Sequence, residues 1–208
     1  MQNKVLFVLA APSGTGKTTV ARQLLDRDSG LVRSVSCTTR KKRSSEQDGE
    51  CYQFTEEGRF LEMVEAGDFL EFAKIYGCFY GTPKKGISQA FARDKDVLLV
   101  VDWQGARQIK DAYEDCVTIF LLPPSYQALE DRLQGRGEDP EAVLARRLGG
   151  ALQEFEHYTD FDYLVVNEDL RICVENVEAV IKSERLKTQR QAHRCHDLLA
   201  RLRKEMTL

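Results

Sequence analysis

The stretch APSGTGKT, residues 11–18, decides the fold of this chain. It follows the continuously apolar run VLFVLA at residues 5–10, and the apolar residues from Val20 to Leu25 after it recur at helical spacing. A glycine-rich loop between a buried strand and a helix is the context that a phosphate-binding loop requires. Gly14 and Gly16 let backbone N–H groups turn toward an anion, and the helix N-terminus adds partial positive charge. The stretch therefore predicts a nucleoside triphosphate site.

Two side chains of the loop carry the expected chemistry. Lys17 would reach the β- and γ-phosphates, and the Thr18 hydroxyl would be a ligand of Mg²⁺. The strict motif has glycine at the position of Ala11, and an ordinary glycine-rich turn is the structural alternative. The residues expected to contact ATP here are Ala11, Pro12, Ser13, Gly14, Thr15, Gly16, Lys17, Thr18 and Thr19.

Further apolar runs predict the rest of the core. VLLVV starts at Val97, VTIFLL at Val117 and YLVV at Tyr163, with helical patterns between them. Strands that alternate with helices predict an α/β fold, a doubly wound parallel sheet with right-handed crossovers. One helix is expected to begin with Asp139 as N-cap and Pro140 in its first turn. A chain of 208 residues, 42% of them hydrophobic, suits one domain.

Residues 36–90 interrupt the alternation. YQF at residues 52–54 and FLEFA from Phe69 are typical of strands, and the segment from Thr55 between them is typical of a short amphipathic helix. We expect a small mixed α/β insertion at residues 36–90, a helical lid at 126–159, and a core formed by 1–35, 91–125 and 160–208. The last thirty residues predict helix, with Val177, Val180 and Ile181 on its inner face.

Composition excludes several classes of protein. The formal net charge of −3 argues against general nucleic-acid binding, which needs many cations to neutralise phosphates. No run reaches the roughly 18 apolar residues of a membrane span. The six cysteines, 37, 51, 78, 116, 173 and 195, form no CxxC pair, so we expect a reduced, cytoplasmic protein. The sequence predicts neither a monomer nor an oligomer.

SVSCTTRKKR, residues 34–43, ends in four consecutive cations. Arg40 and Arg43 lie three residues apart and can present two planar forks to one phosphate. Lys41 and Lys42 are typical of a solvated surface. An exposed loop carrying all four charges is the alternative, which this stretch alone leaves open.

Several motifs together resemble the guanylate kinase family over essentially the whole chain. The matching stretches are APSGTGKT, SVSCTTRKKR, GECY, FLEFAKIYGCFYGT, VDWQGARQI, FLLPPS, RLQGRGED and DYLVVNEDL. The resemblance implies a phosphate-loop core, a monophosphate-binding insertion and a small lid. It also implies Mg²⁺-dependent transfer of a phosphoryl group from ATP to GMP, which would make ADP and GDP for GTP supply.

The resemblance also assigns site residues. It implies catalytic roles for Lys17, Arg40, Arg136 and Arg147, and further ATP contacts from Arg132, Arg136 and Asn167. It implies GMP contacts from Ser36, Arg40, Arg43, Tyr52, Glu71, Tyr80, Thr82 and Asp102, and metal contacts from Thr18 and Asp102. One carboxylate at Glu71 would accept both guanine donors, N1–H and the 2-amino group; without the family, Glu71 is typical of the outward face of a strand.

Three questions stay open in the sequence. Helical geometry sets Arg147 beside the stripe of Leu144 and Leu148 and turns Arg146 away, which does not decide which arginine enters the site. Val100 stands where many family members have an acidic residue, so Asp102 would serve both GMP and the metal. A protein-binding module of the same fold and a kinase for another monophosphate are the competing hypotheses.

Overall fold

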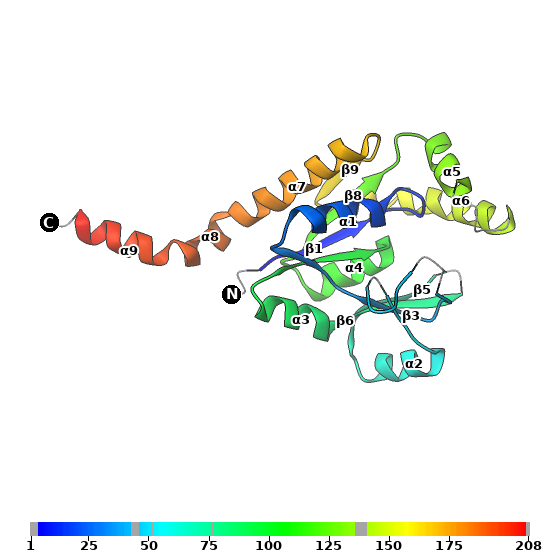
Figure 1. The fold of residues 1–208 in the computed structure, drawn as a ribbon, viewed down its shortest axis with the longest axis horizontal. Helices are drawn as coiled ribbons and strands as arrows, with labels where there is room; N and C mark the ends of the chain where they lie inside the picture. Colours follow the sequence, from blue (N-terminus) through cyan, green and yellow to red (C-terminus); the bar gives the residue numbers. More distant parts are fainter. Residues whose placement is uncertain (1–3, 43–45, 51, 76, 136–140, 207–208) are drawn as a thin grey trace.

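The computed structural model describes residues 4–42, 46–50, 52–75, 77–135 and 141–206 (Figure 1). Its larger sheet has five strands in the order β2-β7-β1-β8-β9, and every pairing between them is parallel. The strands are β1 (Leu6–Ala10), β2 (Leu31–Arg33), β7 (Asp96–Val101), β8 (Val117–Leu122) and β9 (Tyr163–Val166). The predicted α/β class with a parallel sheet is confirmed.

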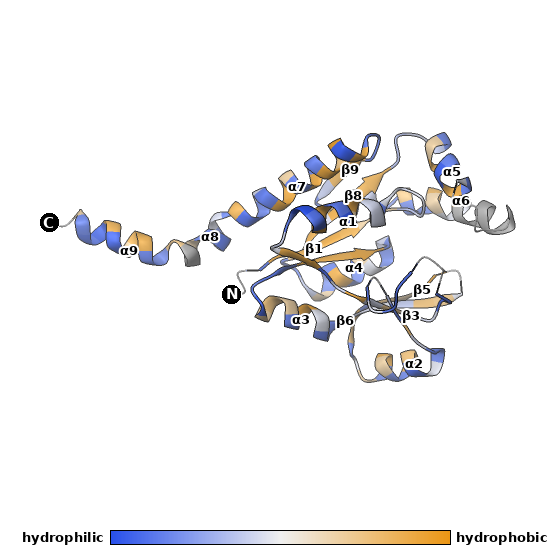
Figure 2. Ribbon diagram, viewed as in Figure 1, coloured by the Kyte–Doolittle hydropathy of each residue, from blue (hydrophilic) through white to orange (hydrophobic). Residues whose placement is uncertain are grey.

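Helices bury both faces of this sheet. Phe7 and Leu9 of β1 point to the face covered by α1 (Lys17–Arg27) and α7 (Leu170–Leu186). Leu6 and Val8 point to the face covered by α3 (Lys84–Ala92) and α4 (Trp103–Ala112). Burial on both faces explains why the strand is apolar at every position, and each such side chain contributes about 1.5–3 kcal/mol. Figure 2 shows these strands as the most hydrophobic part of the molecule.

The insertion forms a second, four-stranded sheet in the order β4-β3-β6-β5. Its strands are β3 (Ser36–Thr38), β4 (Tyr52–Phe54), β5 (Phe69–Ile75) and β6 (Cys78–Pro83). Pairing is mixed, because β3 and β4 are parallel whereas β6 is antiparallel to both β3 and β5. Helix α2 (Glu57–Glu65) covers one face through the fully buried Phe60, whose ring stacks on Phe69 at 4.5 Å.

The predicted lid region contains α5 (Tyr126–Gln134), α6 (Glu141–Phe155) and the short 3₁₀ helix η1 (Tyr158–Asp160). Leu129 and Leu133 of α5 pack against Leu148 and Ala151 of α6. The expected N-cap at Asp139 and the first-turn Pro140 lie outside the described residues.

The C-terminal helix prediction is confirmed for α7, where Val177 and Ile181 are buried and Val180 packs against the same core. Beyond it, α8 (Thr188–Arg194) and α9 (His196–Glu205) lead away from the body of the molecule (Figure 1). Within the described ranges, no helix combines the length and the apolar character that crossing a membrane demands.

Candidate active site

The phosphate loop has the backbone that its glycines allow. Gly14 and Gly16 adopt φ values of 89° and 103°, in the left-handed region that favours glycine. Helix α1 begins at Lys17, directly after Gly16, so its unpaired N–H groups open toward the loop. A Cβ on Gly16 would lie 2.6 Å from Nδ2 of Asn167, so the loop also needs glycine there for space.

Two side chains from distant segments brace this loop. Asn167, which follows β9 and is only 4% exposed, donates from Nδ2 to the Thr15 carbonyl at 2.7 Å. Arg132 of α5 donates from Nη2 to the Asn167 carbonyl at 2.9 Å and from Nη1 to the Thr15 carbonyl at 3.4 Å. Both residues, predicted as ATP contacts, therefore lie at the loop, where they hold its backbone.

Lys17 and Asp102 lie at the same edge of the large sheet. Strands β1 and β7 are parallel neighbours, with Ala10 opposite Val101, so the residues that follow each strand come together. Asp102 caps α4 by accepting the Gly105 N–H at 2.9 Å. Burial raises the pKa of Asp102, although that N–H and the Lys17 ammonium oppose the shift. In this structure Lys17 Nζ donates to the Ala11 carbonyl.

Glu71 of β5 is a buried carboxylate, only 5% exposed. The Thr82 hydroxyl of β6, fully buried, donates to its Oε1 at 2.5 Å. Burial, with a smaller contribution from the Asp102 charge, raises the pKa of Glu71 to about 7 despite the Thr82 donors. A Cβ on Gly105 would lie 2.8 Å from Oε2 of Glu71, so the insertion and the core approach closely at this carboxylate.

Arg40 lies in an aromatic and acidic setting. Its guanidinium donates two hydrogen bonds to the Glu46 carboxylate, from Nη1 to Oε2 at 3.0 Å and from Nη2 to Oε1 at 2.7 Å. The same group lies 5.5 Å from the ring centre of Tyr52, whose ring meets that of Tyr80 edge-on at 6.0 Å. Hydrogen bonding to Glu46 and Tyr80 outweighs burial and raises the pKa of Arg40, which keeps it a fixed cation.

Helix α6, in the predicted lid region, contributes a carboxylate near Lys17 of the phosphate loop. Glu154, near the end of α6, has a buried Oε2 atom, and burial raises the pKa of this carboxyl to about 7. The Lys17 charge opposes that shift and the Asp102 charge adds to it, so the three side chains share one region. His157, just beyond α6, stacks on Trp103 with ring centres 3.6 Å apart.

Comparison with known proteins decides the family. The guanylate kinase family model matches residues 3–184. The chain belongs to the guanylate kinase family. It is 46% identical to the guanylate kinase of Methylobacillus flagellatus over 197 residues, which cover 95% of this chain and 98% of the relative. The guanylate kinase of Nitrosococcus oceani is also 46% identical over 197 residues, 95% of this chain and 97% of the relative.

A solved guanylate kinase supports the same assignment. The crystal structure of guanylate kinase from Anaplasma phagocytophilum superposes with a TM-score of 0.76 at 36% identity, covering 90% of this chain and 89% of that one. The resemblance inferred from separate motifs is thus confirmed over nearly the whole chain.

Not every residue expected from the guanylate kinase motifs can be placed. Arg43 and Arg136 lie outside the described residues, and of Arg147 the structure describes the α6 backbone only. Ser36 begins β3, opposite Tyr52 in register, and is 7% exposed. Sequence reasoning missed Glu46 and Glu154, because an acidic residue in a charged loop or helix is usually solvated.

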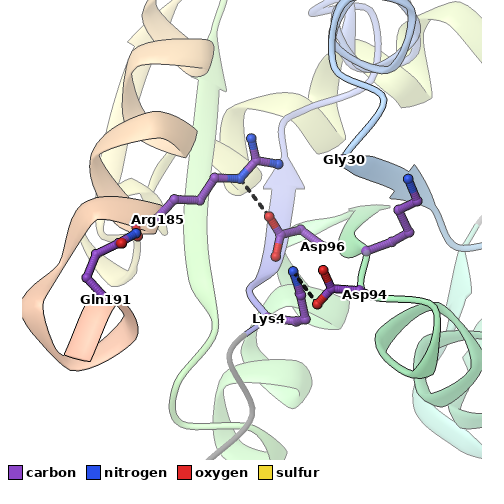
Figure 3. A pocket seen from close by; sticks show the side chains of 7 residues that line it. Lys4, Gly30, Asp94, Asp96, Arg185 and Gln191 are labelled. Atoms are coloured by element: carbon purple, nitrogen blue, oxygen red, sulfur yellow. Dashed lines mark hydrogen bonds and ion pairs between the residues drawn. The ribbon is translucent and has the colours of Figure 1, made fainter. Parts of the chain in front are cut away.

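A cavity of about 340 Å³ lies at the other end of the sheet (Figure 3). Lys4 precedes β1 and Asp96 opens β7, so this cavity lies at the amino ends of the strands, opposite the phosphate loop. Its charges pair with one another: Lys4 with Asp94 at 2.7 Å, and Arg185 with Asp96 at 2.6 Å. Arg185 also binds Asp28 at 2.6 Å, so this network joins α7 to β7 and to the end of α1.

Proposed function

We propose that this protein transfers the γ-phosphoryl group of ATP to GMP, giving ADP and GDP. The observation that carries the proposal is the buried Glu71 carboxylate, bonded to Thr82 and near Asp102, which itself lies beside the phosphate-loop lysine. This arrangement supports a guanine site and a triphosphate site at the same strand ends. Membership of the guanylate kinase family supports the same reaction.

Glu71 would select the base. Guanine presents N1–H and its 2-amino group side by side, and one ionised carboxylate can accept both. Adenine presents no such pair of donors at this edge, so it would leave the carboxylate buried and unpaired. Sites that depend on such bonds reject the wrong ligand by roughly 10⁴-fold or more. In this proposal Thr82 orients the carboxylate, and Ser36 and Asp102 complete the base site.

Arg40 would bind the GMP phosphate. Its guanidinium stays charged at working pH, and its planar fork suits phosphate oxygens. Glu46 accepts one N–H of Nη1 and one of Nη2 and holds the guanidinium in place, so the phosphate would bind N–H groups that Glu46 leaves, and GMP binding removes less side-chain freedom. The hydroxyls of Tyr52 and Tyr80 are further contacts in this proposal, as is Arg43.

The phosphate loop would bind ATP through its N–H groups and Lys17, with Arg132, Arg136, Asn167 and Arg147 closing or bracing that site. The oxygen donors near Lys17 fit Mg²⁺, which prefers one or two carboxylates together with substrate phosphates. Thr18, exposed in the first turn of α1, and Asp102 are the residues proposed to hold it. When bound with ATP, the ion would neutralise charge that develops on the transferred group.

The test is ADP formation from ATP and Mg²⁺ with GMP, AMP, CMP or UMP as the acceptor. We expect turnover with GMP and little with the other three. Efficient turnover with another monophosphate would refute the role of Glu71 but leave a phosphoryl transferase. Tight GMP binding without any turnover would favour a binding module of the same fold. The cytoplasmic location stays a prediction from the cysteine pattern.

A further inference from the structure

The end of helix α6 is fixed next to Asp102. The imidazole of His157 stacks on the indole of Trp103, the residue after Asp102, with the two planes only 8° apart. The His157 N–H donates to the Glu154 carbonyl at 3.3 Å, so Glu154 lies one turn before the stacked ring. Phe155 packs against the core on the α3 and α4 face of the large sheet and against the cluster between α5 and α6. Phe155 and His157, which follow Glu154 in the chain, therefore fix this end of α6 by packing.

The Glu154 carboxylate has an acceptor atom without a donor. Oε2 is buried and accepts no hydrogen bond within the described part of the chain. Native structures pair nearly all buried polar atoms, so an exception at a candidate active site points to a missing ligand. Among the described residues, the Lys17 charge attracts this carboxylate and the Asp102 charge repels it. A positively charged or hydrogen-donating occupant between Glu154 and Asp102 would satisfy both carboxylates.

Asp102, which follows β7 and caps α4, is the acidic side chain that this end of the strand brings to the site. One oxygen of Asp102 accepts a hydrogen bond from the Gly105 N–H. The Val100 side chain packs against the core on the α1 and α7 face of the large sheet. Glu154 reaches the same region from the lid. Two carboxylates beside a phosphate loop match the number that Mg²⁺ takes in nucleotide sites.

We propose that Glu154 is a positioning residue that, with Asp102, accepts hydrogen bonds from water molecules around the Mg²⁺ ion of bound ATP. This inference rests on the proposed function, because it requires ATP at the phosphate loop. It assigns the lid a metal-dependent task in addition to the arginines. Outer partners of this kind typically change metal affinity by roughly 10–100-fold when removed.

The experiment measures ATP affinity by calorimetry, without GMP, in EDTA and in excess Mg²⁺. The proteins are the full chain, Glu154→Gln, Glu154→Asp and the control Glu156→Gln, at an exposed residue just after α6. For Glu154→Gln we expect the Kd of ATP in EDTA divided by its Kd in Mg²⁺ to fall roughly 10–100-fold. ATP in EDTA should bind as well or better, because a negative charge near its phosphates is gone. Glu154→Asp should keep part of this ratio, and the control Glu156→Gln should have the same ratio as the unaltered protein.

A role for Glu154 in packing alone predicts a different pattern. Affinity for ATP would then weaken equally in EDTA and in Mg²⁺, which would overturn the inference, as would an unchanged ratio in Glu154→Gln. Thermal unfolding of each variant checks that it is folded. The proposed function is tested separately by GMP-dependent ADP formation in the unaltered protein. Turnover there with an unchanged ratio in Glu154→Gln would remove this inference and leave the function standing.

Discussion

Replacement of Glu71 by glutamine tests the base-reading site most directly. The amide keeps the size of the carboxylate but has only one acceptor. Thr82 donates to the present side chain from its hydroxyl at 2.5 Å and from its backbone N–H. These donors favour the amide oxygen, so the NH₂ group would face the N–H donors of guanine. The substitution should therefore replace a hydrogen bond by a repulsive contact between the NH₂ group of glutamine and the N–H donors of guanine.

The size of the effect follows from hydrogen-bond energies. Loss of one bond to a charged acceptor costs about 1.5–3 kcal/mol, and a donor left unpaired in a buried site costs about 1–3 kcal/mol. Together they predict a decrease of roughly 10²–10⁴-fold in kcat/KM for GMP. IMP lacks the 2-amino group, so its kcat/KM should fall less than that of GMP. The KM for ATP should not change.

The assay is steady-state ADP formation with GMP, IMP and AMP as acceptors. Glu62→Gln, on the exposed face of α2, is the control for loss of a carboxylate in the insertion. A change of less than threefold in kcat/KM for GMP would refute the reasoning, and so would an equal loss with IMP and GMP. Glu71→Gln should unfold at a temperature no lower than the parent protein, since a buried charge is costly.

Three further predictions concern the loop, the phosphate site and pH. Gly16→Ala should weaken ATP binding at least tenfold in calorimetry, because the new Cβ would lie 2.6 Å from the Asn167 side chain and φ is 103°. The control Gly149→Ala, in open space on α6, should leave the free energy of unfolding unchanged or raise it by up to about 1 kcal/mol. Arg40→Lys, which keeps the charge but loses the fork, should raise the KM for GMP about tenfold and leave that for ATP unchanged. For Glu71 the folded pKa is about 7 against an ordinary 4.5, so the native state binds more protons between these values. Denaturant unfolding should show stability falling as pH rises from about 4.5 to 7, by roughly 3 kcal/mol for this group, and a flatter profile in Glu71→Gln.

The sequence predicted the elements whose burial leaves a regular pattern. Strand β1 is apolar throughout, and β7 and β8 are apolar except at Asp96 and Thr118, because helices cover both faces of their sheet. The edge strand β9 is also apolar, although Leu164 and Val166 are about half exposed. Strands β2 and β3 have three residues each and lack the two aromatic residues that make the equally short β4 typical of a strand. Strand β6 contains Gly81 and Pro83, which are typical of turns, and it is a strand because β3 and β5 pair with it on either side.

The site residues also differ in whether a local sequence pattern could predict them. The local motif predicted the phosphate loop from the residues alone, whereas the roles of Glu71 and Arg40 were predicted through the resemblance to the family. Glu46 and Glu154 have no local signature, since their importance comes from the tertiary contact with Arg40 and from burial beside Lys17. Asn167 was predicted as an ATP contact, and the structure shows its side chain hydrogen-bonded to the Thr15 carbonyl of the phosphate loop. Only the fold brings such residues together.

Burial of Glu71 and Glu154 links substrate binding to protons. Burial favours the neutral form of each carboxyl, and each pKa lies near 7, so the free protein carries them partly protonated at neutral pH. In the proposed roles, guanine donors and metal-bound water require the ionised form. Binding of GMP and of ATP with Mg²⁺ should therefore release protons, and both affinities should rise as pH increases through 7. The free protein thus holds two carboxylates that are costly to ionise, and in the proposed roles each substrate would supply the partner that makes one of them stable.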